Sequence, residues 1–212
     1  MGLFSVKTKG SKQTLADAVD LSGADEAVLM QRIIARDEAA FGVLYHQYYK
    51  RLHRFINRMT SNTGATEEAI NDTLYVVWDK AETFRAETKL STWIFGIAYN
   101  KALKVLEKNR KGQFIFGQDV DDYEVEDQAM PIEQMEVGRW LSAGLAQLSP
   151  VHRTTVELSY HFGMSYNEIA DIMDCSANTA KTRMFYARKK LRIILPTLAE
   201  HSTDAGDQHD SD

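Results

Sequence analysis

One segment constrains the fold more than any other part of the chain: residues 165–191, SYNEIADIMDCSANTAKTRMFYARKKL. Its first part spaces Ile169, Ile172 and Met173 with a helical period, which places all three on one buried face. A short turn follows, and the hydroxyl of Ser176 can then cap the first turn of a longer helix. The pattern predicts a helix-turn-helix.

The second helix of this segment has two distinct faces. Its apolar residues recur at helical spacing, so this face is buried; they are Ala180, Met184, Ala187, Leu191 and Ile194. The opposite face carries Asn178, Lys181, Thr182, Phe185, Arg188, Lys189 and Arg192. A cationic face is most often only solvated. Here the small Ala170 at the helix crossing, the tight turn and the cap favour a helix that reads the major groove of DNA.

The charge of the chain is divided along its length. The whole chain has a net charge of −5. Residues 25–112 hold 14 Lys+Arg against 11 Asp+Glu, a net charge of +3, and residues 137–198 hold 8 against 4, a net charge of +4. Residues 113–136 hold 8 acidic and no basic residues, and residues 199–212 hold 5 and none. Two mildly basic modules are therefore joined and followed by acidic segments, a distribution compatible with nucleic-acid binding.

Several function classes are disfavoured by what the sequence lacks. Cys175 is the only cysteine, so an internal disulfide and a thiolate zinc cluster are both excluded. No run approaches the roughly 18 apolar residues of a membrane span, and the first residues lack a secretory core. Walker A, dinucleotide-binding and HExxH motifs are absent, so we expect no catalytic residues, metal or cofactor. The sequence predicts a soluble cytoplasmic protein without membrane insertion.

Helical periodicity extends over most of the chain, and no strand pattern is convincing. We expect helices at 25–36, 38–60, 66–81 and 91–108, a helix from Val137, another from Ser149, and then the helix-turn-helix. The predicted fold class is all-α, with two helical domains joined by an acidic flexible linker. The expected divisions are a flexible extension, 1–24, a first domain, 25–112, a linker too charged to pack, 113–136, a helix-turn-helix domain, 137–198, and an acidic disordered tail, 199–212.

The helix predicted at 66–81 has a buried and an outward face. The buried stripe is made by Ile70, Thr73, Leu74 and Val77. The outward stripe consists of Glu68, Asn71, Asp72, Tyr75 and Asp79. A solvated face is the ordinary interpretation, but an outward tyrosine within a polar rim favours a protein partner.

The segment 84–112 combines aromatic, amide and lysine side chains. The residues expected to face inward are Ile94, Ile97, Ala98, Ala102 and Val105. Those left for the outside or the rim are Trp93, Asn100, Lys101, Lys104, Lys108, Arg110 and Lys111. Rings that stack on bases and cations that meet phosphates suit single-stranded nucleic acid. From the residues alone, an ordinary core role for Trp93 and Phe95 and an ordinary surface role for the lysines are equally open.

Four segments resemble a known family. DEAAFGVLYHQYYKRLHRFINRM, EEAINDTLYVVWDK and FRAETKLSTWIFGIAYNKALKVLEKNRK resemble, in order, region 2 of an extracytoplasmic-function (ECF) sigma factor of the sigma-70 family. LSPVHRTTVELSYHFGMSYNEIADIMDCSANTAKTRMFYARKKL is similar to region 4. The resemblance implies a dissociable subunit that gives bacterial RNA polymerase its promoter specificity, and it implies an anti-sigma factor as a further partner.

The resemblance also implies three groups of functional residues. One group docks on the polymerase core and consists of Glu68, Asn71, Asp72 and Tyr75. The clamp and the flap are the parts of the core that the resemblance implies as contacts. The group that captures melted −10 DNA is Arg85, Lys89, Trp93, Asn100, Lys101 and Lys104. The group that reads the −35 duplex is Ser176, Asn178, Thr179, Lys181, Thr182, Arg183 and Arg188.

Some positions depart from the family pattern. Asn71 replaces the usual Gln. Asp174 stands where Gly is common in the turn, and Asp tolerates a left-handed backbone better than most residues. Gly96 stands where Arg is frequent and weakens its helix by up to about 1 kcal/mol relative to Ala. A competing interpretation is a stand-alone helix-turn-helix regulator with a helical sensor or dimerisation domain, which would leave the Trp93, Asn100 and lysine cluster without a purpose.

Overall fold

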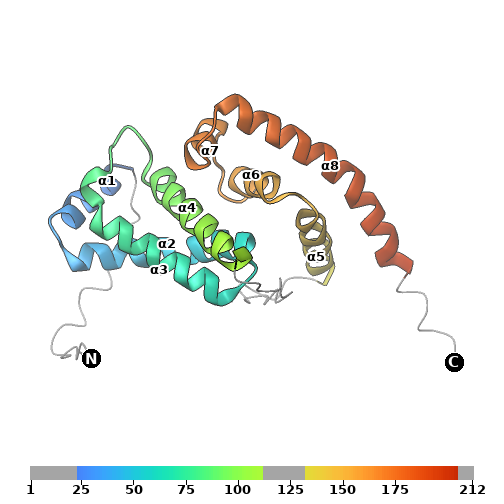
Figure 1. Cartoon of the computed structure of the whole chain (residues 1–212), viewed down its shortest axis with the longest axis horizontal. Coiled ribbons are helices and arrows are strands. Elements are labelled where there is room, and N and C mark those ends of the chain that lie inside the picture. Colours follow the sequence, from blue (N-terminus) through green and yellow to red (C-terminus); the bar gives the residue numbers. More distant parts are fainter. Residues whose placement is uncertain (1–22, 112–131, 205–212) are drawn as a thin grey trace.

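The computed structural model describes residues 23–111 and 132–204, and every regular element in these ranges is helical. The first group is α1 (Gly23–Ile34), α2 (Glu38–Thr60), α3 (Thr63–Asp79), a 3-10 turn η1 (Ala81–Thr83) and α4 (Leu90–Lys111). The second group is α5 (Ile132–Ala146), α6 (Pro150–Tyr160), α7 (Tyr166–Ile172) and α8 (Ala177–Asp204) (Figure 1). The predicted all-α fold with two helical domains is confirmed.

Side-chain caps set several helix ends. The Asp37 carboxylate accepts the backbone N–H groups of Ala39 and Ala40 at 2.9 and 3.2 Å, so α2 begins at the residue predicted. The start of α3 lies three residues before the predicted one, at Thr63. The reason is the side-chain oxygen of Asn62, which accepts the Ala65 N–H at 2.8 Å and caps the new first turn.

Three of the predicted divisions of the chain have different boundaries in the structure. Helix α5 begins at Ile132, inside the segment predicted as linker. In the sequence, Pro131 comes immediately before it. Proline is well tolerated where a helix begins, because it has no N–H group and the first N–H groups of a helix have no partner within the helix. Helix α8 continues through Pro196 to Asp204, inside the predicted tail. Helix α1 begins at Gly23, so the last two residues of the predicted extension are helical. The remaining residues of the predicted extension, linker and tail lie outside the described residues.

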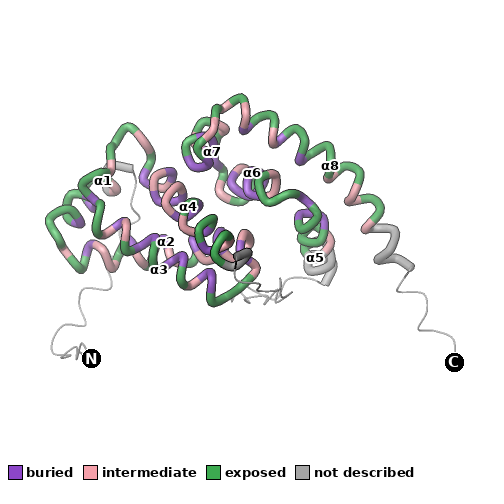
Figure 2. The backbone as a smooth tube through the Cα atoms, in the orientation of Figure 1, coloured by how far each residue is buried: buried purple, intermediate pink, exposed green. Residues whose placement is uncertain are grey.

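The core of the first domain is built from the apolar stripes that the sequence predicted. In Figure 2 the buried stretches of α2, α3 and α4 alternate with exposed ones along each helix. The buried members include Leu44, Leu52 and Phe55 of α2 and the predicted stripe of α3. In α4 the predicted residues are buried except Ile97, which is half-buried. Phe95 is fully buried, so the core interpretation of that ring is correct.

The second domain has a smaller core of its own. It joins Leu145, Leu148, Val156, Met184 and Ala187, and the predicted apolar face of α8 is therefore confirmed for its first turns. Helices α7 and α8 form the helix-turn-helix.

The turn between α7 and α8 is closed by a left-handed residue. Asp174 has φ 47°, a left-handed conformation that glycine adopts more readily than other residues. Aspartate was expected to tolerate a left-handed backbone at this position, and the structure shows that it adopts one.

The two domains pack against each other. Helix α4 lies against α7, and α2 meets α6 (Figure 1). One apolar cluster runs across this boundary, from Phe55 and Phe95 of the first domain to Ile169, Ile172 and Met173 of the second. The sequence predicted two tethered modules and gave no sign of this contact.

Candidate nucleic-acid and polymerase interfaces

The outward face of α3 is exposed, as predicted. Glu68, Asn71, Asp72 and Tyr75, which we call the α3 stripe, all reach solvent, and Tyr75 is 65% exposed. Lysines of α4 lie beside them: the Lys101 ammonium is 2.9 Å from the Asp72 carboxylate, and the Lys108 ammonium is 3.0 Å from the Glu68 carboxylate. The α3 stripe and Lys101, one of the predicted DNA-binding lysines, thus belong to one surface that spans two helices.

The other predicted −10 residues lie on α4 and the loop before it. The Trp93 ring is half-buried and packs on Phe84 with ring centroids 5.4 Å apart. Asn100 is exposed, and its side-chain amide donates to the Gly96 carbonyl at 3.0 Å. Because Trp93, Asn100 and Lys104 are seven and four residues apart, they share one side of α4. Lys101 is turned away from that side, towards α3.

Both helices of the helix-turn-helix begin with a side-chain cap. The backbone N–H of Ser165 donates to the Glu168 carboxylate at 2.8 Å, and the Glu168 N–H donates to the Ser165 hydroxyl at 3.3 Å, a capping box at the start of α7. At the start of α8 the Ser176 hydroxyl accepts the Thr179 N–H at 3.0 Å. The predicted cap is therefore confirmed, and it fixes the direction in which α8 leaves the turn.

Most of the predicted −35 residues lie on the outward face of α8. The exposed members are Ser176, Asn178, Lys181, Thr182 and Arg188, and Thr179 is half-buried. The Arg188 guanidinium rests over the Tyr160 ring, 5.6 Å from its centroid. Phe185 and Tyr186 are also exposed on α8.

Arg183 is placed differently from its neighbours. Its guanidinium is half-buried and donates to the Cys175 sulfur at 3.4 Å. Its positive charge also influences Tyr99 of α4. Burial raises the pKa of the Tyr99 hydroxyl, and the charge of Arg183 opposes part of that rise. In this arrangement Arg183 faces the first domain.

A set of residues between the domains was missed by reasoning from the sequence. Glu157 of α6 is only 4% exposed, and its carboxylate accepts from Arg58 of α2, 99 residues earlier in the chain. Phe162 lies between rings of α2 and α4. The one sequence signal was an acid between the apolar residues Val156 and Leu158, and nothing local identifies the partner of that acid.

Family comparisons agree with the two domains. The model of Sigma-70 region 2 matches residues 44–112, and the model of Sigma-70 region 4 matches residues 138–191. The matched ranges run from within α2 to the end of α4, and from within α5 to the middle of α8. Within residues 23–111 and 132–204, no helix is long and apolar enough to cross a lipid bilayer.

Two relatives with curated names are similar to most of this chain. The ECF RNA polymerase sigma factor RpoE of Cereibacter sphaeroides is 28% identical over 179 residues, which are 82% of this chain and 97% of that protein. SigL of Mycobacterium tuberculosis, also an ECF RNA polymerase sigma factor, is 29% identical over 169 residues, 77% of this chain and 93% of that protein.

Solved structures share the fold. The sigma factor RpoE in complex with the anti-sigma factor NepR, from Bartonella quintana, matches with a TM-score of 0.61 and 25% identity over 74% of this chain and 96% of that one. CnrH in complex with the cytosolic domain of CnrY has a TM-score of 0.60 and 19% identity over 80% and 96%, a likeness of fold. A region 2 bundle followed by a region 4 helix-turn-helix defines the class. The chain belongs to the sigma-70 family, and within it to the ECF sigma factors.

Proposed function

We propose that this sigma factor binds the core of bacterial RNA polymerase and directs it to promoters by reading −35 duplex DNA with α8 and capturing melted −10 DNA with α4. The observation that carries the proposal is the presence in one chain of both family regions in order, each with an exposed polar face suited to its task.

Core binding is assigned to the α3 stripe. Its members offer carboxylates, an amide and an exposed phenol on a single helix face. Exposed aromatic side chains are enriched in protein interfaces, whereas they contribute little to a surface that meets only water. We assign the partner surface to the polymerase clamp, with region 4 meeting the flap.

Capture of the −10 strand is assigned to α4 and the loop before it. Trp93 supplies a ring that packs on Phe84, and Asn100, on the same side of α4, supplies a side-chain amide with a donor and an acceptor. Extruding a base from duplex DNA costs a few kcal/mol, which stacking and edge hydrogen bonds must offset. Arg85, Lys89, Lys101 and Lys104 supply the positive charge that follows the phosphates.

Recognition of the −35 duplex is assigned to the outward face of α8. Asn178 and Thr182 are exposed near its amino-terminal end, the part of a recognition helix that contacts base edges. Lys181 and Arg188 carry charges suited to the flanking phosphates. Arg183 belongs to the same proposed group, although in this structure its guanidinium is half-buried beside Cys175.

Three further assignments follow from this role. An anti-sigma factor is expected as a partner, on the analogy of the complex of RpoE with the anti-sigma factor NepR. The chain would supply binding energy and specificity while the polymerase supplies the chemistry, so it is not itself an enzyme. Its place is the cytoplasm, because the polymerase and the promoters lie there.

Run-off transcription tests the proposal. Purified chain and core polymerase are mixed with a library of genomic fragments, and we expect discrete transcripts that are absent when either protein is omitted. A pull-down with core polymerase separates this role from that of a stand-alone regulator. A chain that bound DNA but neither retained core nor produced transcripts would contradict the proposal and favour the regulator.

A further inference from the structure

The last turn of α6 carries an aromatic residue outside the three predicted groups of functional residues. Tyr160 is 63% exposed, and the guanidinium carbon of Arg188 on α8 lies over its ring, 5.6 Å from the centroid. A cation within about 6 Å of a ring centroid is attracted to the negative face of the ring. Helices α6 and α8, which pack together in the second domain (Figure 1), thus contribute one side chain each to a single exposed contact.

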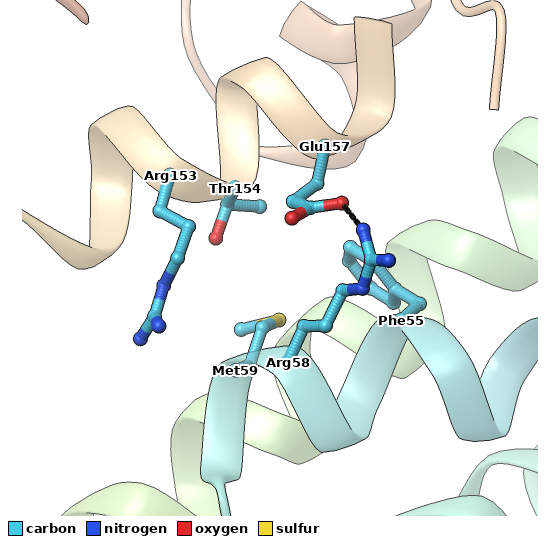
Figure 3. Close-up of a pocket in the computed structure, with 6 residues that line it drawn as sticks. All are labelled: Phe55, Arg58, Met59, Arg153, Thr154 and Glu157. Atoms are coloured by element: carbon cyan, nitrogen blue, oxygen red, sulfur yellow. Dashed lines mark hydrogen bonds and ion pairs between the residues drawn. The ribbon is translucent and has the colours of Figure 1, made fainter. Parts of the chain in front are cut away.

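The neighbours of Tyr160 hold the turn on which it stands. Glu157, three residues earlier, is buried, and its carboxylate accepts from Arg58 of α2 (Figure 3). Nδ1 of His161 lies 3.0 Å from the same carboxylate, and the His161 backbone N–H donates to the Glu157 carbonyl at 2.9 Å. The side chains on either side of Tyr160 are therefore paired, while the Tyr160 ring itself reaches solvent.

Arg188 lies on the outward face of α8, farther along the helix than the residues assigned to base edges. Lys181 and Arg188 are seven residues apart, so they share one side of the helix. Arg188 follows Asn178 by ten residues, which is about 15 Å along the axis. The major groove is only about 12 Å wide and about 8.5 Å deep. A recognition helix whose amino-terminal end contacts bases therefore has Arg188 beyond those bases, at the level of the phosphates.

A ring beneath an arginine prepares it for a phosphate. A free arginine side chain samples many rotamers, and fixing it in one of them on binding costs free energy. The contact with Tyr160 restricts the Arg188 side chain before DNA arrives. Because a planar guanidinium stacks through its face, the N–H groups in its plane remain available to donate to phosphate oxygens.

We propose that Tyr160 is a positioning residue for the −35 contact, whose ring holds the Arg188 guanidinium in the orientation in which it donates to a phosphate beside the groove. The inference rests on the proposed function of α8. It brings α6 into the −35 interface, and it gives Tyr160 a role that acts through Arg188 and not through the tyrosine hydroxyl.

The exposure of the pair separates positioning from a role in folding. Tyr160 and Arg188 both reach solvent, and a cation–π contact at an exposed site is weak. Removing the Tyr160 ring should therefore leave the urea midpoint of the chain nearly unchanged. The loss should instead be seen where the orientation of Arg188 matters, which is in binding to DNA.

Nuclear magnetic resonance of the free full-length chain tests the contact directly. The ring current of Tyr160 should shift the Nε–Hε signal of Arg188 upfield, and Arg188→Lys, which lacks this signal, assigns it. The shift should persist in Tyr160→Phe, which keeps a ring, and disappear in Tyr160→Leu, which does not. An Arg188 signal at the same position in the unmodified chain and in Tyr160→Leu would overturn the contact.

Binding of the full-length chain to a labelled mixed-sequence DNA duplex at low salt tests the positioning, because phosphate contacts do not depend on sequence. Tyr160→Leu should weaken binding about two- to fivefold. It should leave the slope of log K against log salt unchanged, since Arg188 keeps its charge. Arg188→Ala should reduce that slope by about 0.9. The conservative variant Tyr160→Phe should retain the affinity.

A double variant shows whether the ring acts through the arginine. In an Arg188→Ala background, Tyr160→Leu should cause no further loss of affinity. An equal loss with and without Arg188 would overturn the positioning role, because the ring would then act on DNA by itself. A loss in Tyr160→Phe as large as that in Tyr160→Leu would overturn it as well, since the hydroxyl would be the contact. Run-off transcription with core polymerase decides the proposed function separately, because these measurements require neither promoter nor polymerase.

Discussion

Reversing the charge of Asp72 should separate polymerase binding from folding. The Asp72 carboxylate and the Lys101 ammonium are 2.9 Å apart, with side chains 56% and 23% exposed. An ion pair this accessible contributes about 0–1 kcal/mol. Asp72→Arg removes the pair and adds a repulsion that salt screens. We therefore expect the free energy of unfolding to fall by about 1 kcal/mol or less.

The same substitution should affect polymerase binding much more strongly. A reversed charge in the middle of a docking face costs several kcal/mol, because it meets unpaired or like charges on the partner. A loss of about 3 kcal/mol corresponds to a dissociation constant for core polymerase raised by more than about 100-fold. Urea unfolding and competition binding with labelled core measure the two effects on the same preparation.

A double variant separates the local pair from the interface. Asp72→Lys with Lys101→Asp exchanges the two charges and keeps an ion pair between α3 and α4, so stability should return towards that of the unmodified chain. The charge offered to the polymerase at position 72 remains reversed, and core binding should stay weak. Full core affinity in Asp72→Arg would refute the assignment of the α3 stripe. Recovery of affinity in the exchanged variant would show that the defect was structural.

Three further predictions concern DNA contacts and the capping box. Lys181→Ala should weaken promoter binding and reduce the slope of log K against log salt by about 0.9, the loss of one phosphate contact; an unchanged slope removes Lys181 from the interface. Asn100→Ala should leave core binding intact but prevent promoter opening, with activity largely restored on a template already mismatched at −10; a normal permanganate footprint on duplex template would contradict base capture. Hydrogen bonds from Lys89 and Ser165 lower the pKa of Glu168 to about 2. Because this pKa is depressed by folding, its contribution is complete above the ordinary value of 4.5 and is lost as the pH falls towards 2. The stability difference between the unmodified chain and Glu168→Gln, measured by urea unfolding, should therefore be constant above about pH 5 and shrink below it; a difference independent of pH would exclude the ionised pair as its source.

The sequence by itself determined the helices and their faces. The start of α2, the buried stripe of α3 and the cap of α8 at Ser176 follow from periodicity and from side chains that bond their own backbone within a few residues. For Asp174 the family resemblance indicated the position, and the tolerance of aspartate for a left-handed backbone agrees with its φ of 47°. These features depend on neighbours in the chain, so the sequence contains all that is needed to predict them. The start of α3 was predicted at Thr66, three residues too late. The Asn62 side chain accepts the Ala65 N–H and so caps the helix earlier, within a segment of small and polar residues.

Only the tertiary structure decided how the two domains meet. Glu157 is buried because Arg58, 99 residues earlier, lies opposite it, and no pattern along either helix indicates that pairing. Lys89 was predicted to meet phosphate, but in the structure its ammonium lies beside Glu168. From the sequence, Gly96 was predicted to weaken its helix. In the structure, α7 approaches α4 closely at Gly96. The physical reason is that helix formation is governed by contacts near in sequence, whereas the packing of one finished domain on another depends on surfaces that exist only after each has folded.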